Sequence, residues 1–135
     1  MASQVPGQQA ETNSFLRFSW EKPKGIFVLH PISKCALPAI VFATGAFNGN
    51  ALAVIAGADG LSAQQMQAIA NWTNFSETTF LLEPHDARAD YRVRIFCPGR
   101  ELPFAGHPTL GSCHAWLGAG GQPQTPGRVV QECGV

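Results

Sequence analysis

Four short apolar runs between residues 39 and 96 place the strongest constraint on how this chain folds. The runs are Ala39–Phe42, Ala51–Ile55, Thr78–Leu82 and Tyr91–Phe96. Runs of this length, bounded by glycine, proline and polar residues, are typical of β-strands. In the last run apolar residues alternate with arginines, as they do in a strand that is buried on one face. The sequence therefore predicts a sheet as the main element of the fold.

Two helices are expected beside these strands. Ser62 stands three residues before Gln65, which is the spacing of a capping box, and predicts a helix over about residues 63–71. Pro108 suits the first position of a second helix, where its missing N–H costs no hydrogen bond. The glycine-rich run at residues 118–121 ends that helix.

The first 37 residues differ from the remainder of the chain. They are polar, irregular and interrupted by prolines, and only residues 25–29 have the pattern of a short strand. We predict a divergent or disordered N-terminal extension over residues 1–37 and one domain over residues 38–135. Within that domain, residues 128–135 have the pattern of a last strand.

The composition is that of a globular chain and argues against several classes of partner. Apolar residues make up 45% of the chain, charged residues 13%, and nine basic residues balance nine acidic ones. A nucleic-acid-binding protein or one bound to an anionic membrane normally has a basic excess. No apolar run approaches the roughly 20 residues of a membrane helix, and no secretory signal is recognisable. Four widely spaced cysteines are typical of reduced, buried thiols, so we predict a cytoplasmic protein.

Residues 105–111 form the most informative candidate site. Unpaired backbone N–H groups and the helix dipole attract anions to the N-terminus of a helix. Gly106 would allow a ligand to approach the backbone, His107 offers a side-chain donor, and Thr109 adds a hydroxyl. Together they would bind a substrate carboxylate. Taken alone, the segment is more typical of an ordinary loop-to-helix junction with a histidine packed at its cap.

Two further candidates stand at the beginnings of predicted strands. Glu77 precedes an apolar strand and would act as a general base that needs neither a metal nor an organic cofactor. Asn50 follows Gly49 between two strands and would hold a ligand amide or carboxylate. Each has an ordinary alternative, a solvated strand end for Glu77 and a turn for Asn50. The adjacent Cys113 and His114 point in different directions on a helix, so they make a poor catalytic pair.

Five motifs, taken together and in order, resemble the PhzF-like (phenazine-biosynthesis) isomerase family. The motifs are Val41–Asn50, Leu61–Ala70, Ser76–Phe80, Arg94–Pro98 and Glu101–Gly111. Residues 129–133 also resemble the stretch that follows the helix of the family's N-terminal domain. The resemblance runs from about residue 41 to residue 135, and its order and spacing are more specific than any single motif.

The resemblance implies an α+β fold of the diaminopimelate-epimerase type, in which a sheet wraps around a central helix. Family members have two such domains, and their active site lies in the cleft between them. They move a proton on a small carboxylic acid without a cofactor, as in phenazine biosynthesis. The resemblance makes Glu77 the general acid/base and assigns Gly49, Asn50, Gly106 and His107 to the substrate cleft.

The resemblance also implies that the active site is incomplete in this sequence, because the match covers the N-terminal domain alone. Ala51, Cys97 and Ile40 stand where the family commonly has proline, threonine and aspartate. We expect an isomerase-family domain that has little activity by itself, since one wall of the cleft no longer excludes water. The alternatives are a non-catalytic small-molecule-binding protein and a truncated family member. A homodimer that pairs two such domains face to face is a further arrangement that the sequence leaves open.

Overall fold

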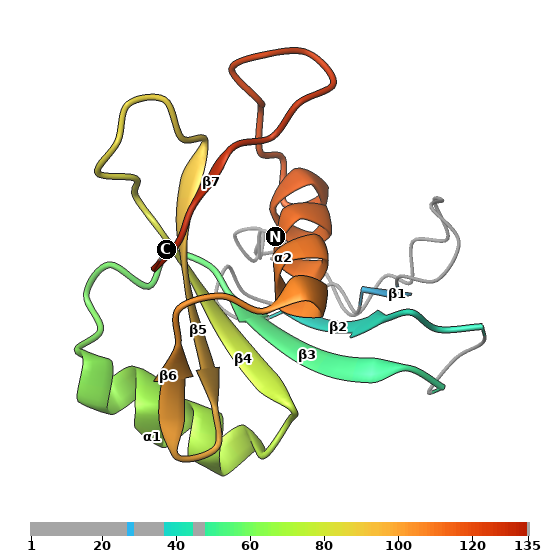
Figure 1. Cartoon of the computed structure of the whole chain (residues 1–135), viewed down its shortest axis with the longest axis vertical. Coiled ribbons are helices and arrows are strands. Elements are labelled where there is room, and N and C mark those ends of the chain that lie inside the picture. The colour runs from blue at the N-terminus through green and yellow to red at the C-terminus, as the bar shows by residue number, and fades with distance from the viewer. Residues whose placement is uncertain (1–26, 29–36, 45–47, 135) are drawn as a thin grey trace, which may run out of the picture.

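The computed structural model of the 135-residue chain describes residues 27–28, 37–44 and 48–134 (Figure 1). The described strands are β1 (Phe27–Val28), β2 (Leu37–Val41), β3 (Asn50–Ile55), β4 (Glu77–Leu82), β5 (Tyr91–Cys97), β6 (Arg100–Leu102) and β7 (Gln131–Glu132). Two helices accompany them, α1 (Ala63–Thr73) and α2 (Gly106–Gly118). Neither helix has the length and apolar character that crossing a membrane requires.

All seven strands belong to one mixed sheet with the order β1-β2-β3-β4-β5-β6. The strand β7 pairs with the beginning of β5, whereas β6 pairs with the end of the same strand. Most neighbours are antiparallel, but β3 and β4 run parallel, with Leu52 opposite Glu77. Because α1 makes the crossover between these two strands, both begin at the same end of the sheet. That end carries Asn50 and Glu77.

The two helices pack against different faces of the sheet. Successive residues of a strand point to opposite faces, so Glu77, Thr79 and Leu81 of β4 share one face. The cluster on that face draws on four strands and α2, namely Ala39, Val41, Leu52, Val54, Leu81, Tyr91, Val93, Ile95 and Ala115. The opposite face packs Phe80, Leu82 and Phe96 against Met66 and Ala70 of α1. One helix enclosed by residues of four strands is the α+β arrangement that the sequence predicted (Figure 1).

Local sequence signals account for most of the observed elements. The predicted capping box closes α1, since the Gln65 N–H donates to Ser62 Oγ over 3.2 Å and the Ser62 N–H donates to Gln65 Oε1 over 2.8 Å. The helix ends at Asn74, whose φ of 52° is the left-handed conformation common at helix ends. Residues 25–29 contribute the two-residue strand β1.

Two sequence expectations about strands were wrong. The last strand is shorter than the predicted residues 128–135, because only Gln131 and Glu132 pair with β5. The strand β6 was not predicted, since three residues after a tight turn give too short a pattern to detect. An ion pair of Arg94 with Glu101 joins β6 to β5, with the two nitrogen–oxygen contacts at 2.7 and 2.6 Å.

The described cysteines Cys97, Cys113 and Cys133 are half-buried rather than fully buried.

The helix α2 lies unusually close to the sheet at Gly111. A Cβ built on Gly111 would stand 2.5 Å from Leu52 Cδ2 and 2.9 Å from Val41 Cγ2, closer than carbon atoms pack. One turn later, Ala115 is fully buried in the cluster on the same face. Small residues along this side of α2 therefore allow the helix to approach β2 and β3.

We expect Gly111→Ala to destabilise the fold by about 1 kcal/mol. Overpacking a core costs about 1–3 kcal/mol, and the gain in helix propensity of about 1 kcal/mol offsets only part of that cost. The matched control is Gly60→Ala, because a Cβ at Gly60 meets nothing within 4 Å. The measurement is urea unfolding of both variants. A Gly111→Ala variant as stable as the natural chain would contradict the close approach of α2.

Candidate active site

Glu77 and His107 lie in contact although thirty positions separate them in the sequence. Glu77 begins β4, and His107 is the second residue of α2. The distance from Glu77 Oε2 to His107 Nε2 is 2.9 Å, and the two side chains are only 17% and 11% exposed. The structure therefore brings together the candidate base and the candidate carboxylate-binding histidine that the sequence singled out separately.

Neither contacting atom makes a hydrogen bond. Glu77 Oε2 and His107 Nε2 are both buried, and at 2.9 Å the direction of the contact still does not meet the geometry of a hydrogen bond. A buried polar atom without a partner costs about 1–3 kcal/mol, so such atoms are rare and call for an explanation. A ligand that bonds to both atoms would supply one.

Other described carboxylates differ from Glu77 in this respect. Glu101 pairs with Arg94, Asp86 with Arg88, and Asp90 accepts hydrogen bonds from the backbone. These groups stabilise strands and loops through contacts that are already complete. Among the four carboxylates compared here, Glu77 alone has a buried oxygen without a hydrogen bond.

The N-terminus of α2 beside Glu77 is open. No side chain caps it, because its N-cap residue is Ala105, in contrast with the capping box of α1. A Cβ at Gly106 would meet nothing within 4 Å, so there is free space at the first turn. The Thr109 hydroxyl donates to Ala105 O over 2.8 Å within that turn and keeps its lone pairs for an acceptor role. Anions favour an arrangement of this kind.

The predicted Gly49–Asn50 pair lies on the neighbouring strand. Asn50 begins β3 and is exposed, and it shares the face of Leu52 and Val54, on which α2 packs. Since Leu52 is opposite Glu77, Asn50 lies roughly 7 Å before the level of Glu77 along the strand direction. Among the described residues, no hydrogen bond joins the Asn50 side chain to Glu77 or His107. The structure thus places Gly49 and Asn50 at the same end and face as the candidate site, without contact to its centre.

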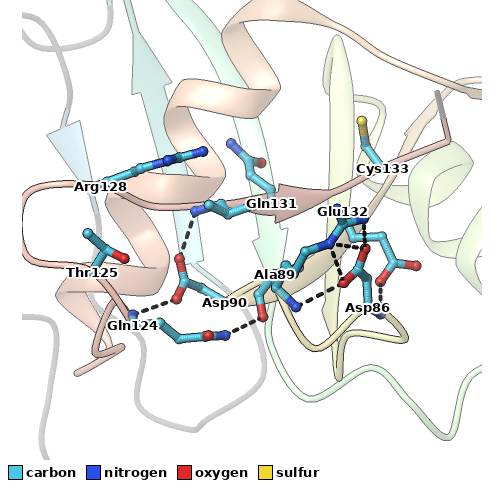
Figure 2. A pocket seen from close by; sticks show the side chains of 11 residues that line it. Asp86, Ala89, Asp90, Gln124, Thr125, Arg128, Gln131, Glu132 and Cys133 are labelled. Carbon is cyan, nitrogen blue, oxygen red and sulfur yellow. Dashed lines mark hydrogen bonds and ion pairs between the residues drawn. The ribbon is translucent and has the colours of Figure 1, made fainter.

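A hollow of the described surface lies elsewhere. It has a volume of about 580 Å³, and Figure 2 shows it between the β4–β5 connection and the segment before β7. Its lining includes Asp86, Arg88, Asp90, Gln124 and Glu132 but neither Glu77 nor His107. We base the candidate site on the buried pair of side chains, because the charged groups of the hollow are mostly engaged in contacts within the chain.

Asp90 holds the segment of residues 124–130 against the start of β5. Its two carboxylate oxygens accept hydrogen bonds from the N–H groups of Gln124 and Val130, each over 2.7 Å (Figure 2). These two backbone N–H groups, that of Gln124 first, hold the pKa of Asp90 below its usual value of 3.8. No local sequence pattern indicates this contact, because the partners of Asp90 lie 34 and 40 positions away.

Other chemistries find less support in the described parts of the chain. Burial raises the pKa of the Cys113 thiol, and the nearby Asp90 charge adds to the effect. That shift disfavours the thiolate needed by a nucleophile, in agreement with the prediction for Cys113 and His114. No group of three or more His, Cys, Asp or Glu side chains suitable for holding a metal ion occurs among the described residues.

The structure is an α+β domain in which a buried Glu–His pair lies at the N-terminus of a helix. A family model for phenazine biosynthesis-like proteins (PhzC-PhzF) matches residues 40–135. The chain belongs to this family, as its motifs indicated. The site residues fall within the matched range.

Known relatives agree with this assignment. Antisense-enhancing sequence 1 of Schizosaccharomyces pombe is 52% identical over 93 residues, which cover 69% of this chain and 31% of that protein. The trans-2,3-dihydro-3-hydroxyanthranilate isomerase of Pseudomonas chlororaphis is 54% identical over 78 residues, covering 58% of this chain and 27% of that enzyme. The crystal structure of a PhzF-family phenazine biosynthesis protein from Bacillus anthracis superposes with a TM-score of 0.65 at 32% identity, covering 73% and 32% of the two chains.

The chain spans less than a third of the length of each of these proteins. The isomerase named above and similar enzymes from other Pseudomonas species show that named isomerases occur among its relatives.

We expect acid to weaken the attachment of residues 124–130 through Asp90. Because the folded-state pKa of Asp90 is lowered, its stabilising contribution is present above pH 3.8 and is lost as the pH falls through the lower folded value. Asp90→Asn keeps one acceptor oxygen but no charge, so its Tm at pH 7 should be lower than that of the natural chain. The difference in Tm between the two should be smaller near pH 3. Thermal unfolding followed by circular dichroism measures both. An equal gap at the two pH values would contradict this role.

Proposed function

We propose that this chain provides the proton-transferring wall of an isomerase active site that acts on a small carboxylic acid with an acidic C–H bond. The observation that carries the proposal is the buried contact of Glu77 with His107, whose facing atoms lack hydrogen-bond partners. The open N-terminus of α2 lies beside that contact. A base and an anion-binding helix end in one place suit proton transfer next to a carboxylate.

In this proposal Glu77 is the group that moves the proton. Its ionised carboxylate takes a proton from a substrate carbon, and the electron pair of the broken C–H bond remains on the substrate. The resulting carboxylic acid then returns the proton to another carbon or to the other face of the same carbon. The substrate is thereby rearranged without net oxidation or reduction.

His107 and the first turn of α2 bind and orient the substrate. The N–H groups of a helix N-terminus and the imidazole are donors suited to a carboxylate. They also stabilise the negative charge that develops when the C–H bond breaks, which is often the largest contribution to catalysis. Free space at Gly106 permits the ligand to reach the backbone.

The name of the Pseudomonas chlororaphis relative supports a cyclic amino acid of the dihydro-hydroxyanthranilate type as the first substrate to test. A role in phenazine-type biosynthesis, a cytoplasmic location and a homodimer stay predictions from the sequence. We also propose that a second wall, supplied by further polypeptide, closes the site, since the matched relatives are more than three times as long as the part they share with this chain. Water exclusion by that wall would strengthen the electrostatic contacts of Glu77.

The decisive variant for catalysis is Glu77→Gln, tested in the protein as its natural gene produces it. We expect the natural protein to exchange deuterium from D2O into trans-2,3-dihydro-3-hydroxyanthranilate. Glu77→Gln should lower the rate of this exchange by about 10²–10⁴-fold, the usual contribution of a general base. Glu83→Gln is the matched control, because Glu83 directly follows the other end of β4 and is exposed. Mass spectrometry of the recovered substrate measures the exchange. Undiminished exchange in Glu77→Gln would refute the assignment of the base.

Binding to the helix end is tested separately with 2-aminobenzoate as a probe. In amide NMR spectra of the 135-residue chain we expect shifts at Gly106 and His107. Gly106→Ala should weaken binding by about tenfold, equivalent to ~1.4 kcal/mol, because its Cβ occupies the space that the ligand needs. Gly60→Ala, another glycine with open space around it, serves as the control. Shifts confined to Gln124 and Arg128 would instead place the probe in the hollow of Figure 2.

A further inference from the structure

The Glu77–His107 contact joins two elements that meet only in the tertiary structure. Glu77 belongs to β4 and His107 to α2, and neither contacting atom is held by a hydrogen bond. The separation of the two side chains therefore depends on how α2 is seated on the sheet. Any contact that fixes this seating also fixes the geometry of the proposed site.

A buried pair of hydroxyl groups links the same two elements. Ser112 Oγ of α2 donates to Thr79 Oγ1 of β4 over 2.8 Å, and both residues are completely buried. Thr79 Oγ1 in turn donates to Ala53 O of β3, with a longer distance of 3.4 Å. The hydrogen bonds thus run from the helix through β4 to the neighbouring strand.

The hydroxyl pair and the Glu–His pair form two successive links between one strand and one helix. Thr79 lies two residues after Glu77 on the same face of β4, which is roughly 7 Å along a strand. Ser112 lies five residues after His107, which is roughly 7.5 Å along an α-helix. The two links are therefore similarly spaced along the strand and along the helix.

The hydroxyl pair differs in kind from the apolar contacts that surround it. The surrounding contacts of Gly111 and Ala115 of α2 with the sheet cluster that includes Val41 and Leu52 are apolar and largely non-directional. A hydrogen bond between two buried hydroxyls specifies both distance and direction, and breaking it leaves a polar group without a partner. The hydroxyl pair can therefore fix the position of α2 along β4 where apolar packing would tolerate a shift.

We propose that the hydrogen bond between Ser112 and Thr79 is a positioning contact that sets the separation of Glu77 and His107. Thr79 and Ser112 touch no substrate in this proposal and act through the placement of α2. The catalytic meaning of the inference rests on the proposed function, but its test measures the geometry of the pair directly.

The experiment follows the His107 ring nitrogens by NMR in the ¹⁵N-labelled 135-residue chain at one fixed pH. We expect Glu77→Gln to shift the His107 signals in the natural background. In a Thr79→Val background, which keeps the side-chain shape and removes the hydroxyl, that response to Glu77→Gln should fall by more than half. Ser112→Ala should give the same loss, and Thr79→Ser, which keeps the hydroxyl, should restore the response.

Thr78→Val provides a matched control. Thr78 is the adjacent residue, is equally buried, and faces Thr73 of α1, with the two hydroxyl oxygens 3.0 Å apart. Removing its hydroxyl also costs a buried hydrogen bond, but on the face away from α2. We expect Thr78→Val to lower the stability to a similar degree while leaving the response of His107 to Glu77→Gln unchanged.

An unchanged response in Thr79→Val and Ser112→Ala would overturn the inference, as would an equal loss in Thr78→Val. If Thr79→Val fails to fold, the other two variants decide the question, because each changes the side chain little in size. Ser112→Ala removes one hydroxyl of the pair, whereas Thr79→Ser keeps it. The inference and the proposed function fail in different ways. If deuterium exchange is undiminished in Glu77→Gln, the assignment of Glu77 as the catalytic base is refuted. The ¹⁵N signals of the His107 ring would still report whether the hydroxyl pair positions His107.

Discussion

The packing of α2 against the sheet is the contact on which the described structure depends. Gly111 lets the helix approach Val41 and Leu52, and Ala115 completes the buried cluster on that face. The same approach brings Ser112 within hydrogen-bonding distance of Thr79. Since α2 carries His107 at its first turn and β4 carries Glu77, the candidate site exists only because this one interface is tight.

The described polar contacts divide into structural ones and those left open. Asp90 attaches residues 124–130. Glu132 accepts hydrogen bonds from the backbone N–H groups of His85, over 2.7 Å, and Asp86, over 3.1 Å. The backbone N–H of Asp86, together with that of His85, lowers the pKa of Glu132, as expected for a carboxylate in a structural role. These contacts surround the hollow of Figure 2, whereas the facing atoms of Glu77 and His107 contact each other but make no hydrogen bond. Unused bonding capacity, rather than the size of a hollow, is what points to chemistry here.

The parallel pairing of β3 with β4 determines where the site can form. Both strands begin at the same end of the sheet, and the first turn of α2 reaches that end on the face shared by Asn50 and Glu77. A ligand bound there would meet a carboxylate, an imidazole and an open helix N-terminus together. The remaining side of such a site would come from outside the described residues, which is why the proposed isomerase activity concerns the protein as its gene produces it.

The sequence by itself determined most of the elements, though not β6, and the candidate residues. Alternation in Tyr91–Phe96 predicted β5, the Ser62–Gln65 spacing predicted α1, and ordered motifs singled out Glu77, Gly106 and His107. These signals are readable because each depends on residues within a few positions of one another. The tertiary structure alone decided that Glu77 touches His107, that Ser112 bonds to Thr79, and that Asp90 holds residues 124–130. Those contacts join residues about 30 or more positions apart, and only the close seating of α2 and the folding of the sheet bring them together.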